Sequence, residues 1–308
     1  MILAENLSKS YRKVKALTDI NLEVKEGELF GLIGPDGAGK TSLIRILATL
    51  LLADKGRASL MGLDVVKDFR KVRQMIGYMP GRFSLYRDLT VEENIRLFAT
   101  IFDTSLEDNY DLIRDIYVQI EPFRHRRAEA LSGGMKQKLA LCCALIHRPN
   151  ILLLDEPTTG VDAVSRREFW EILAQMQKQG ITILVSTPYM DEAGRCNRVA
   201  LIHNSKILQI DSPANIEAGF GSPLYAVIGQ DTYRLLQHLR QYPHSGTVYP
   251  FGDSIHYTDQ RGEINTADLA EWLRRQGHAN IEVLPIAPNI EDCFMALGSS
   301  QPDASSYV

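Results

Sequence analysis

Short apolar runs alternate with helical repeats over the first two thirds of the chain. Leu29–Ile33 is a continuous apolar run that enters a glycine-rich turn, and apolar residues then recur at helical spacing over Thr41–Leu51. Similar runs at Ile151–Leu154 and Ile181–Val185 flank a helical stretch, Ser165–Gln179, that ends at a glycine. Strands that alternate with helices predict a parallel sheet, so the expected fold class is α/β.

Two changes in this pattern predict the domain organisation. Between residues 82 and 150 the pattern becomes mostly helical, which predicts a helical lobe inserted into an α/β domain of residues 1–220. After Phe220 the elements become shorter, and residues 221–298 are expected to form a small α+β domain, with a flexible polar tail at 299–308. The elements expected in this second domain are a strand at Leu224–Ile228, a helix near Asp231–Gln241, a helix that starts at a Thr266 N-cap and ends near Gly277, and a strand at Ile281–Pro285.

Composition narrows the class of protein. The 308 residues are 45% hydrophobic and 23% charged, with a net charge of −4, which gives no electrostatic reason to expect a nucleic-acid partner. No apolar stretch reaches the roughly 20 residues that cross a bilayer, and the polar N-terminus is unlike a signal peptide, so a cytoplasmic location is expected. The four cysteines show no metal-like spacing and are expected to be reduced and buried.

A glycine-rich loop between a predicted strand and a predicted helix carries the clearest chemistry. It fits G-x-x-x-x-G-K-[ST] and continues into a further hydroxyl residue, so the candidate ATP-binding residues are Gly34, Pro35, Asp36, Gly37, Ala38, Gly39, Lys40, Thr41 and Ser42. Glycines let backbone N–H groups converge on phosphate oxygens, Lys40 supplies a compact positive charge, and Thr41 would ligate Mg²⁺. A purely structural glycine turn explains neither the lysine nor the two hydroxyls.

Two carboxylates follow the apolar run Ile151–Leu154. They lie at the carboxyl edge of the predicted sheet, where open α/β folds bind ligands. Asp155 would hold Mg²⁺, and Glu156 would act as the catalytic base that orients water for attack on the γ-phosphate. An Asp-Glu pair before a proline is also common in turns. The pair indicates a catalytic site only in combination with the phosphate loop.

Leu131–Gln137 (LSGGMKQ) opens a further predicted helix, and here the residues resemble the signature of ABC ATPases. The resemblance covers about residues 1–220 and implies a P-loop NTPase fold with ATP and Mg²⁺ as cofactors. It also implies that two such domains stack head to tail, so that four residues of one subunit contact the ATP held by Lys40 of the other: Ser132, Gly133, Gly134 and Asp162. Tyr11 occupies the position of an aromatic that stacks on adenine, although simple packing would explain it equally well.

The chain departs from the ABC pattern at two positions. Gly81 stands where the family keeps a glutamine that contacts Mg²⁺ and the attacking water, and Pro188 stands where it keeps a histidine that contacts the γ-phosphate. Losing one such donor typically costs about 3 kcal/mol in the transition state. Thr187 and Pro188 still suit a helix N-cap and first turn, so the fold is not threatened. These departures predict a site that binds ATP but hydrolyses it slowly, in a heterodimer or tandem fusion, unless Tyr189 or a water replaces the lost contacts.

Two further segments, Met61–Val65 and Pro288–Phe294, resemble the bacterial multidrug-exporter branch of the family. This resemblance implies efflux of drugs or other small hydrophobic compounds, by a complex in which the chain lies on the inner face of the membrane beneath permease subunits. Arg82–Leu89, with Phe83, Leu85 and Tyr86, occupies the expected permease-coupling position, or else packs on its own lobe. The competing classes are a soluble ABC ATPase without a permease and a regulatory ATP sensor.

Overall fold

The computed structural model describes residues 1–82 and 84–299, and contacts divide the chain into two compact units, Met1–Pro213 and Ala214–Val308. The division precedes the expected boundary at residue 220 because helix α7 (Pro213–Ala218) packs with the C-terminal helix, where Cys293 Sγ contacts Ile216 O at 3.5 Å. Phe83 and residues 300–308 of the expected tail lie outside the described residues, and Ser299 ends a helix.

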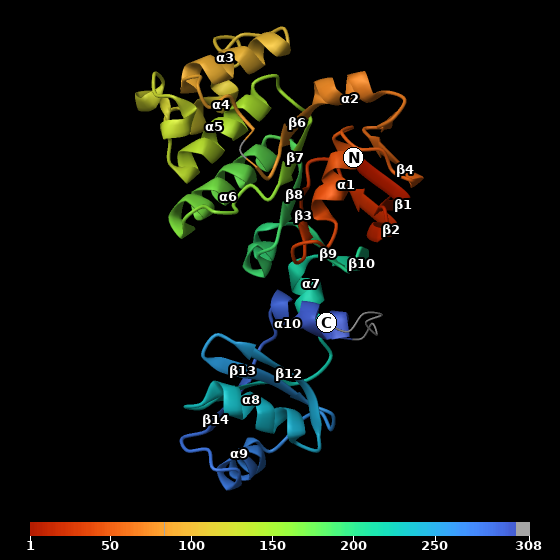
Figure 1. The fold of residues 1–308 in the computed structure, drawn as a ribbon, viewed down its shortest axis with the longest axis vertical. Coiled ribbons are helices and arrows are strands. Elements are labelled where there is room, and N and C mark those ends of the chain that lie inside the picture. Colours follow the sequence, from red (N-terminus) through yellow and green to blue (C-terminus); the bar gives the residue numbers. More distant parts are fainter. Residues whose placement is uncertain (83, 300–308) are drawn as a thin grey trace. The chain divides into compact units, whose positions relative to one another are not determined.

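A six-stranded, mostly parallel sheet forms the centre of the first unit (Figure 1). Its order is β10-β9-β3-β8-β7-β6, and only β10 runs antiparallel to its neighbour. The strands are β3 (Leu29–Ile33), β6 (Ile76–Met79), β7 (Ile151–Asp155), β8 (Thr182–Thr187), β9 (Arg198–His203) and β10 (Lys206–Asp211). The three apolar runs that predicted strands in the first domain are therefore strands of this sheet, and the α/β class is confirmed.

Two helices cover opposite faces of the sheet. In β7 all five residues are buried, and alternate side chains point to opposite faces, so Ile151 and Leu153 join the core beneath α1 (Lys40–Leu47). The other face packs against α6 (Ala163–Lys178). Burial on both sides explains why the strand sequences are continuously apolar.

A second sheet, of order β2-β1-β4-β5, lies against the same core. Its antiparallel strands are β1 (Ile2–Tyr11), β2 (Val14–Val24), β4 (Lys55–Leu60) and β5 (Leu63–Asp64), and α2 (Phe69–Met75) then leads into β6. The turn between β1 and β2 brings Tyr11 next to the phosphate loop, which a linear reading of the sequence does not place.

The predicted helical lobe is present between β6 and β7 (Figure 1). It contains α3 (Val91–Ile101), α4 (Tyr110–Tyr117), the short 3₁₀ helices η1 (Glu121–Phe123) and η2 (Ala128–Ala130), and α5 (Gly133–Leu145). Thr90 and Glu93 form a capping box that starts α3. Asn94, fully buried, bonds the backbone N–H and C=O of Tyr86 and thereby fixes the segment before α3.

The second unit is a four-stranded antiparallel sheet with helices on it. The strands, in the order β12-β13-β11-β14, are β12 (Ser245–Phe251), β13 (Ser254–Asp259), β11 (Leu224–Ile228) and β14 (Glu282–Ile286), and the helices are α8 (Thr232–Gln241), α9 (Thr266–Arg275) and α10 (Ile290–Ser299). The N-cap of α9 is Asn265 and not Thr266, because the Asn265 side chain accepts the Ala267 N–H.

All four cysteines are free and buried, as expected, and burial raises the pKa of Cys142 and Cys143. Among residues 1–82 and 84–299, no helix combines the length and the apolar character needed to cross a bilayer.

The anchoring of α10 depends on a fully buried carboxylate. Asp292 accepts hydrogen bonds from His256 Nδ1 at 2.6 Å and from the Asn289 N–H at 2.9 Å. We expect Asp292→Ala to lower the free energy of unfolding of the second unit by about 2–4 kcal/mol, because both donors lose a charged acceptor in a buried position. Denaturant unfolding in a Trp170→Phe background, where Trp272 is the one tryptophan left, measures this. Glu291→Ala, an exposed change on the same helix, should have almost no effect.

Candidate nucleotide-binding site

The phosphate loop connects β3 to α1, and two of its glycines are required by close backbone contacts. Gly39 has φ +110°, and a Cβ there would lie 2.2 Å from Ala16 O; a Cβ at Gly34 would lie 2.0 Å from Ile202 O. The loop can therefore run this close to β2 and β9 only with glycine at both positions. Its backbone path is set by the sheet around it.

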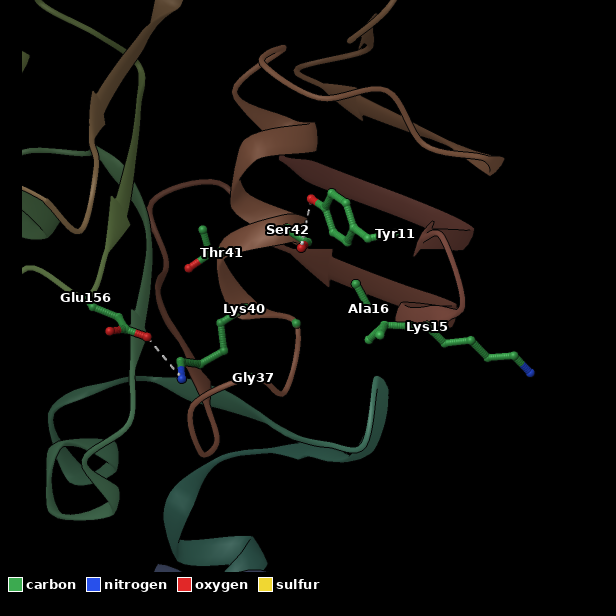
Figure 2. Close-up of a pocket in the computed structure, with 10 residues that line it drawn as sticks. Tyr11, Lys15, Ala16, Gly37, Lys40, Thr41, Ser42 and Glu156 are labelled. Atoms are coloured by element: carbon green, nitrogen blue, oxygen red, sulfur yellow. Dashed lines mark hydrogen bonds and ion pairs between the residues drawn. The ribbon is translucent and has the colours of Figure 1, made fainter. Parts of the chain in front are cut away.

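Lys40 lies inside the loop, with 2% of its side chain exposed. Its Nζ donates to Gly34 O at 2.8 Å and Pro35 O at 3.0 Å, and lies 3.1 Å from Glu156 Oε1 (Figure 2). The ammonium group is thus held at the mouth of the loop and points toward the end of β7. A phosphate oxygen that enters here meets a fixed positive charge.

Asp155 is the centre of a buried hydrogen-bond network. Its Oδ1 accepts from Thr41 Oγ1 at 3.0 Å and from Ser186 Oγ at 2.9 Å, and the residue is 2% exposed. The parallel register that pairs Asp155 with Ser186 brings these groups together. A hydroxyl and a carboxylate oxygen are ligands that Mg²⁺ accepts beside phosphate oxygens and water, so Thr41 and Asp155 fit the ion.

Glu156 has a left-handed backbone conformation, with φ +50°. Such a conformation costs free energy in a residue with a Cβ and persists only when the surroundings hold it. Here the Glu156 N–H donates to both Ser186 O and Ser186 Oγ, at 3.1 and 3.0 Å. The turn directs the carboxylate back over the loop, toward Lys40 (Figure 2).

A cavity of about 330 Å³ lies over the loop, and its lining includes Tyr11, Lys40, Thr41, Ser42 and Glu156. Tyr11 is 44% exposed, and its Oη lies 3.3 Å from Ser42 Oγ, so one face of its ring remains accessible beside the loop (Figure 2). Lining residues that the sequence did not indicate are Val14, Lys15 and Ala16, and the ammonium group of Lys15 points away from the loop in Figure 2.

A second cavity, of about 560 Å³, lies beyond Thr41 and is lined by Gly81, Arg45, Arg82 and the two carboxylates Asp155 and Glu156. A Cβ added at Gly81 would lie 3.0 Å from Asp155 O and 3.8 Å from the carboxyl carbon of Asp155. A side chain at this position would therefore begin beside Asp155. In this chain glycine leaves that space open.

The segment around Pro188 differs from expectation. Thr187 is the last residue of β8 and Pro188 is not helical; the 3₁₀ helix η3 (Met190–Arg195) begins after Tyr189. The Thr187 hydroxyl donates to Glu192 and accepts the Tyr189 N–H, which closes a tight turn instead of a helical first turn. Glu192, 3% exposed, also accepts from Thr158 at 2.9 Å and so ties the turn to the loop after Glu156.

The remaining predicted residues form a separate group. Ser132 caps α5 through the Met135 N–H, and Asp162 caps α6 through the N–H groups of Val164 and Ser165. The bond from the Ser165 N–H lowers the pKa of Asp162. A Cβ at Gly134 would lie 2.6 Å from Ser165 Oγ, so the two caps are neighbours. Neither cap lines the cavities at the phosphate loop.

Sequence reasoning missed Ser186, which donates to Asp155, and Glu192, which joins the two loops. The available signal was the hydroxyl pair Ser186-Thr187, which directly follows the apolar run Ile181–Val185 that predicts a strand. Pairing of this strand with the strand that ends in Asp155 would have been needed to use it.

Asp36 adds a third carboxylate to the mouth of the site. It is 89% exposed, lies 3.9 Å from Lys40 Nζ, and opposes the approach of phosphate. We expect Asp36→Asn to tighten ATP binding by about two- to fivefold at low salt, because an exposed charge interaction amounts to about 1 kcal/mol or less and is screened by ions. Calorimetric titration measures this, and the gain should shrink at high salt. Asp111→Asn, at 88% exposure on α4, is the matched control, and an equal gain there would contradict the assignment.

The family model described as ABC transporter matches residues 17–159. The "Probable multidrug ABC transporter ATP-binding protein YbhF" of Escherichia coli (strain K12) is 38% identical over 220 residues, which are 71% of this chain and 38% of that protein. The chain thus spans about two fifths of the length of this relative. The "Nod factor export ATP-binding protein I" of Burkholderia thailandensis is 32% identical over 298 residues, 95% of each chain.

Solved structures agree with these matches. The dimeric bacterial ABC transporter cassette MJ0796 superposes with a TM-score of 0.63 at 26% identity, covering 69% of this chain and 98% of that one. The ATP binding subunit of an ABC transporter gives a TM-score of 0.66 at 28% identity, over 72% of this chain and 93% of that one. Because the Burkholderia relative matches over nearly its full length, the chain belongs to the ATP-binding proteins of ABC transporters.

Proposed function

We propose that this chain powers an ABC-type exporter as one half of an asymmetric ATPase pair, and that its own phosphate loop binds ATP firmly but turns it over slowly. The observation that supports the proposal is a difference within the site, between the residues around the phosphate loop and the position of Gly81. Lys40, Thr41 and Asp155 lie together and suit a phosphate group and Mg²⁺, whereas Gly81 leaves an open cavity beside Asp155 and Glu156.

In this proposal each residue around the phosphate loop has a separate role. Lys40 holds the β- and γ-phosphates, Thr41 and Asp155 hold Mg²⁺, and Tyr11 packs against the base. Mg²⁺, when bound, offsets the charge on the phosphate oxygens. Glu156 lies 3.1 Å from Lys40 and can accept a proton from a water placed over the γ-phosphate.

Slow turnover follows from the two departures. A base alone does not place the attacking water, and neither glycine at 81 nor proline at 188 offers a side-chain donor. The loss of one preorganised donor typically costs about 3 kcal/mol, a factor of roughly a hundred in rate. In this proposal binding depends mainly on the loop, Lys40, Thr41 and Asp155, which are present, so binding is retained better than turnover.

The second group of residues serves the partner. Ser132, Gly133, Gly134 and Asp162 gather at two neighbouring helix N-termini, where backbone N–H groups suit a phosphate carried by another ATPase domain. The glycines at the start of α5 leave room for close approach. In an asymmetric pair this end completes the hydrolytically competent site while the chain's own site binds ATP.

Export is inferred from the relatives, one of which is named for multidrug transport and another for Nod factor export. Drugs or other small hydrophobic compounds remain our proposal for the transported class. The transported molecule would contact the permease subunits, and the chain would lie at the cytoplasmic face of the membrane beneath them.

A permease helix has a suitable docking surface where the helical lobe meets the end of α1. An apolar cavity of about 320 Å³ lies between the end of α1 and helices α3 and α5, with Leu50, Phe98, Phe102 and His147 among its lining residues. Leu50 is 55% exposed and Tyr86 57%. Asn94 ties the Tyr86 segment to α3, which carries Phe98 and is followed by Phe102, so a docked helix would contact elements that lead to Gly81.

The first test removes the base from this chain alone. In the assembled transporter with its native partner subunits, Glu156→Gln should leave at least about half of the ATPase activity, because the competent site lies on the partner. Phosphate release measures the rate, and Asp162→Ala, which disturbs the partner-facing end, should lower it more. Near-complete loss of activity with Glu156→Gln would show that this site does the hydrolysis.

The second test restores the missing donors. Gly81→Gln combined with Pro188→His should raise ATP hydrolysis at this site by about tenfold or more, because each side chain returns a polar group to the γ-phosphate side. The comparison is Gly81→Ala with Pro188→Ala, which changes the backbone in the same places and adds no donor. If both double variants hydrolyse ATP equally, the departures are not what limits the rate.

The third test concerns docking. Leu50→Glu should abolish co-purification with the permease while nucleotide affinity is unchanged, because burying an unpaired carboxylate against an apolar helix is costly. Val118→Glu, an equally exposed change on the lobe at 51% exposure, is the control. Retention of the permease by Leu50→Glu would place the docking surface elsewhere.

A further inference from the structure

Two buried N–H groups on α6 have no hydrogen-bond acceptor among the described residues. They are Arg166 Nε and Trp170 Nε1, one helical turn apart and therefore on one face. Trp170 is only 3% exposed. A buried donor without a partner costs about 1–3 kcal/mol, so two adjacent ones favour an acceptor from outside the described residues.

Both residues line a cavity of about 190 Å³ between α6 and η3. Arg167 and Arg195 line it as well, together with the carboxylates Asp191 and Glu192. None of these residues lines the cavities at the phosphate loop, so this is a separate place in the first unit.

The carboxylates of the cavity do not satisfy its guanidinium groups. Glu192 is bonded to the hydroxyls of Thr158 and Thr187, and its closest approach to Arg166 Nε is 3.9 Å. Asp191, 76% exposed, also stays 3.9 Å from Arg166. These distances exceed a hydrogen bond, so the donors of Arg166 keep the capacity to bind another oxyanion.

The arginine side chains also place positive charge around the cavity. The Arg166 guanidinium lies 4.4 Å from the ring of Tyr189, which fixes its plane against the turn after Pro188. Arg167 approaches Glu171 only to 4.0 Å, and three guanidinium groups face two carboxylates around the cavity. Planar guanidinium forks are the side chains best suited to bind phosphate oxygens.

We propose that this cavity binds a compact oxyanion of the phosphate class, either free inorganic phosphate or the phosphate group of a small organic monoester. Arg166 and Trp170 donate to it from the base, and Arg195 and Arg167 close the rim. The bound anion joins α6, which begins at the Asp162 cap, to η3, which follows Pro188. It therefore fixes the position of the Pro188 turn relative to the partner-facing end of α6.

The test uses the full chain with Trp272→Phe, which leaves Trp170 as the one tryptophan. Saturating ADP and Mg²⁺ occupy the phosphate loop. Inorganic phosphate and glycerol phosphate, titrated separately at constant ionic strength, should each be examined for a saturable change in Trp170 emission. Saturation with inorganic phosphate alone assigns the free anion, and tighter binding of glycerol phosphate assigns a monoester.

Arg195→Gln, an exposed change with little risk to folding, should weaken the binding at least about tenfold, since a charge-assisted hydrogen bond is lost. Arg114→Gln, on α4 with 58% of its side chain exposed, should leave the affinity unchanged. A second readout is the rise in Tm caused by phosphate, which Trp170→Phe should largely remove. Absence of a saturable change, an equal response to chloride, or equal affinity in Arg195→Gln would overturn the proposal.

Discussion

The geometry of the nucleotide site depends on one buried carboxylate, Asp155. At 2% exposure its charge would be costly unless it is hydrogen-bonded, and the hydroxyls of Thr41 and Ser186 supply those bonds. Thr41 belongs to α1 and Ser186 to β8, so the carboxylate ties together the ends of three chain segments. The requirement to satisfy this group fixes the phosphate loop relative to the sheet before any nucleotide binds.

The same network holds Glu156 in its left-handed conformation, because Ser186 accepts the Glu156 N–H through both its backbone and its hydroxyl oxygen. Gly81 and Pro188 lie just after the strands that flank β7, and neither takes part in this network. Replacing the usual side chains at these positions therefore leaves the cradle intact. In the proposed function, binding and turnover would depend on different residues, and this separation would permit a site that binds ATP but hydrolyses it slowly.

Much of the fold could be predicted because its signals are local. Leu29–Ile33 and Ile151–Leu154 are continuously apolar since both faces of the parallel sheet are covered, and the glycines of the loop have positions that only glycine can occupy. The association of Asp155 with Ser186 could not be predicted, because it depends on which strands pair and in which register. The expected helix at Thr187 failed for a similar reason, since a bond to Glu192 outweighed the local capping preference.

The separation in space between the signature residues and the phosphate loop also depends on the tertiary structure. Ser132 and Asp162 start helices that neighbour each other, and Gly134 allows that approach because a Cβ there would strike Ser165. In the proposed head-to-tail pair each chain would contribute the phosphate loop to its own nucleotide and the signature residues to that of its partner. Under the proposal, the replacements just after β6 and β8 would weaken one site and leave the other unchanged. An asymmetric ATPase pair, as proposed above, would therefore let such a chain contribute to transport through its partner's site.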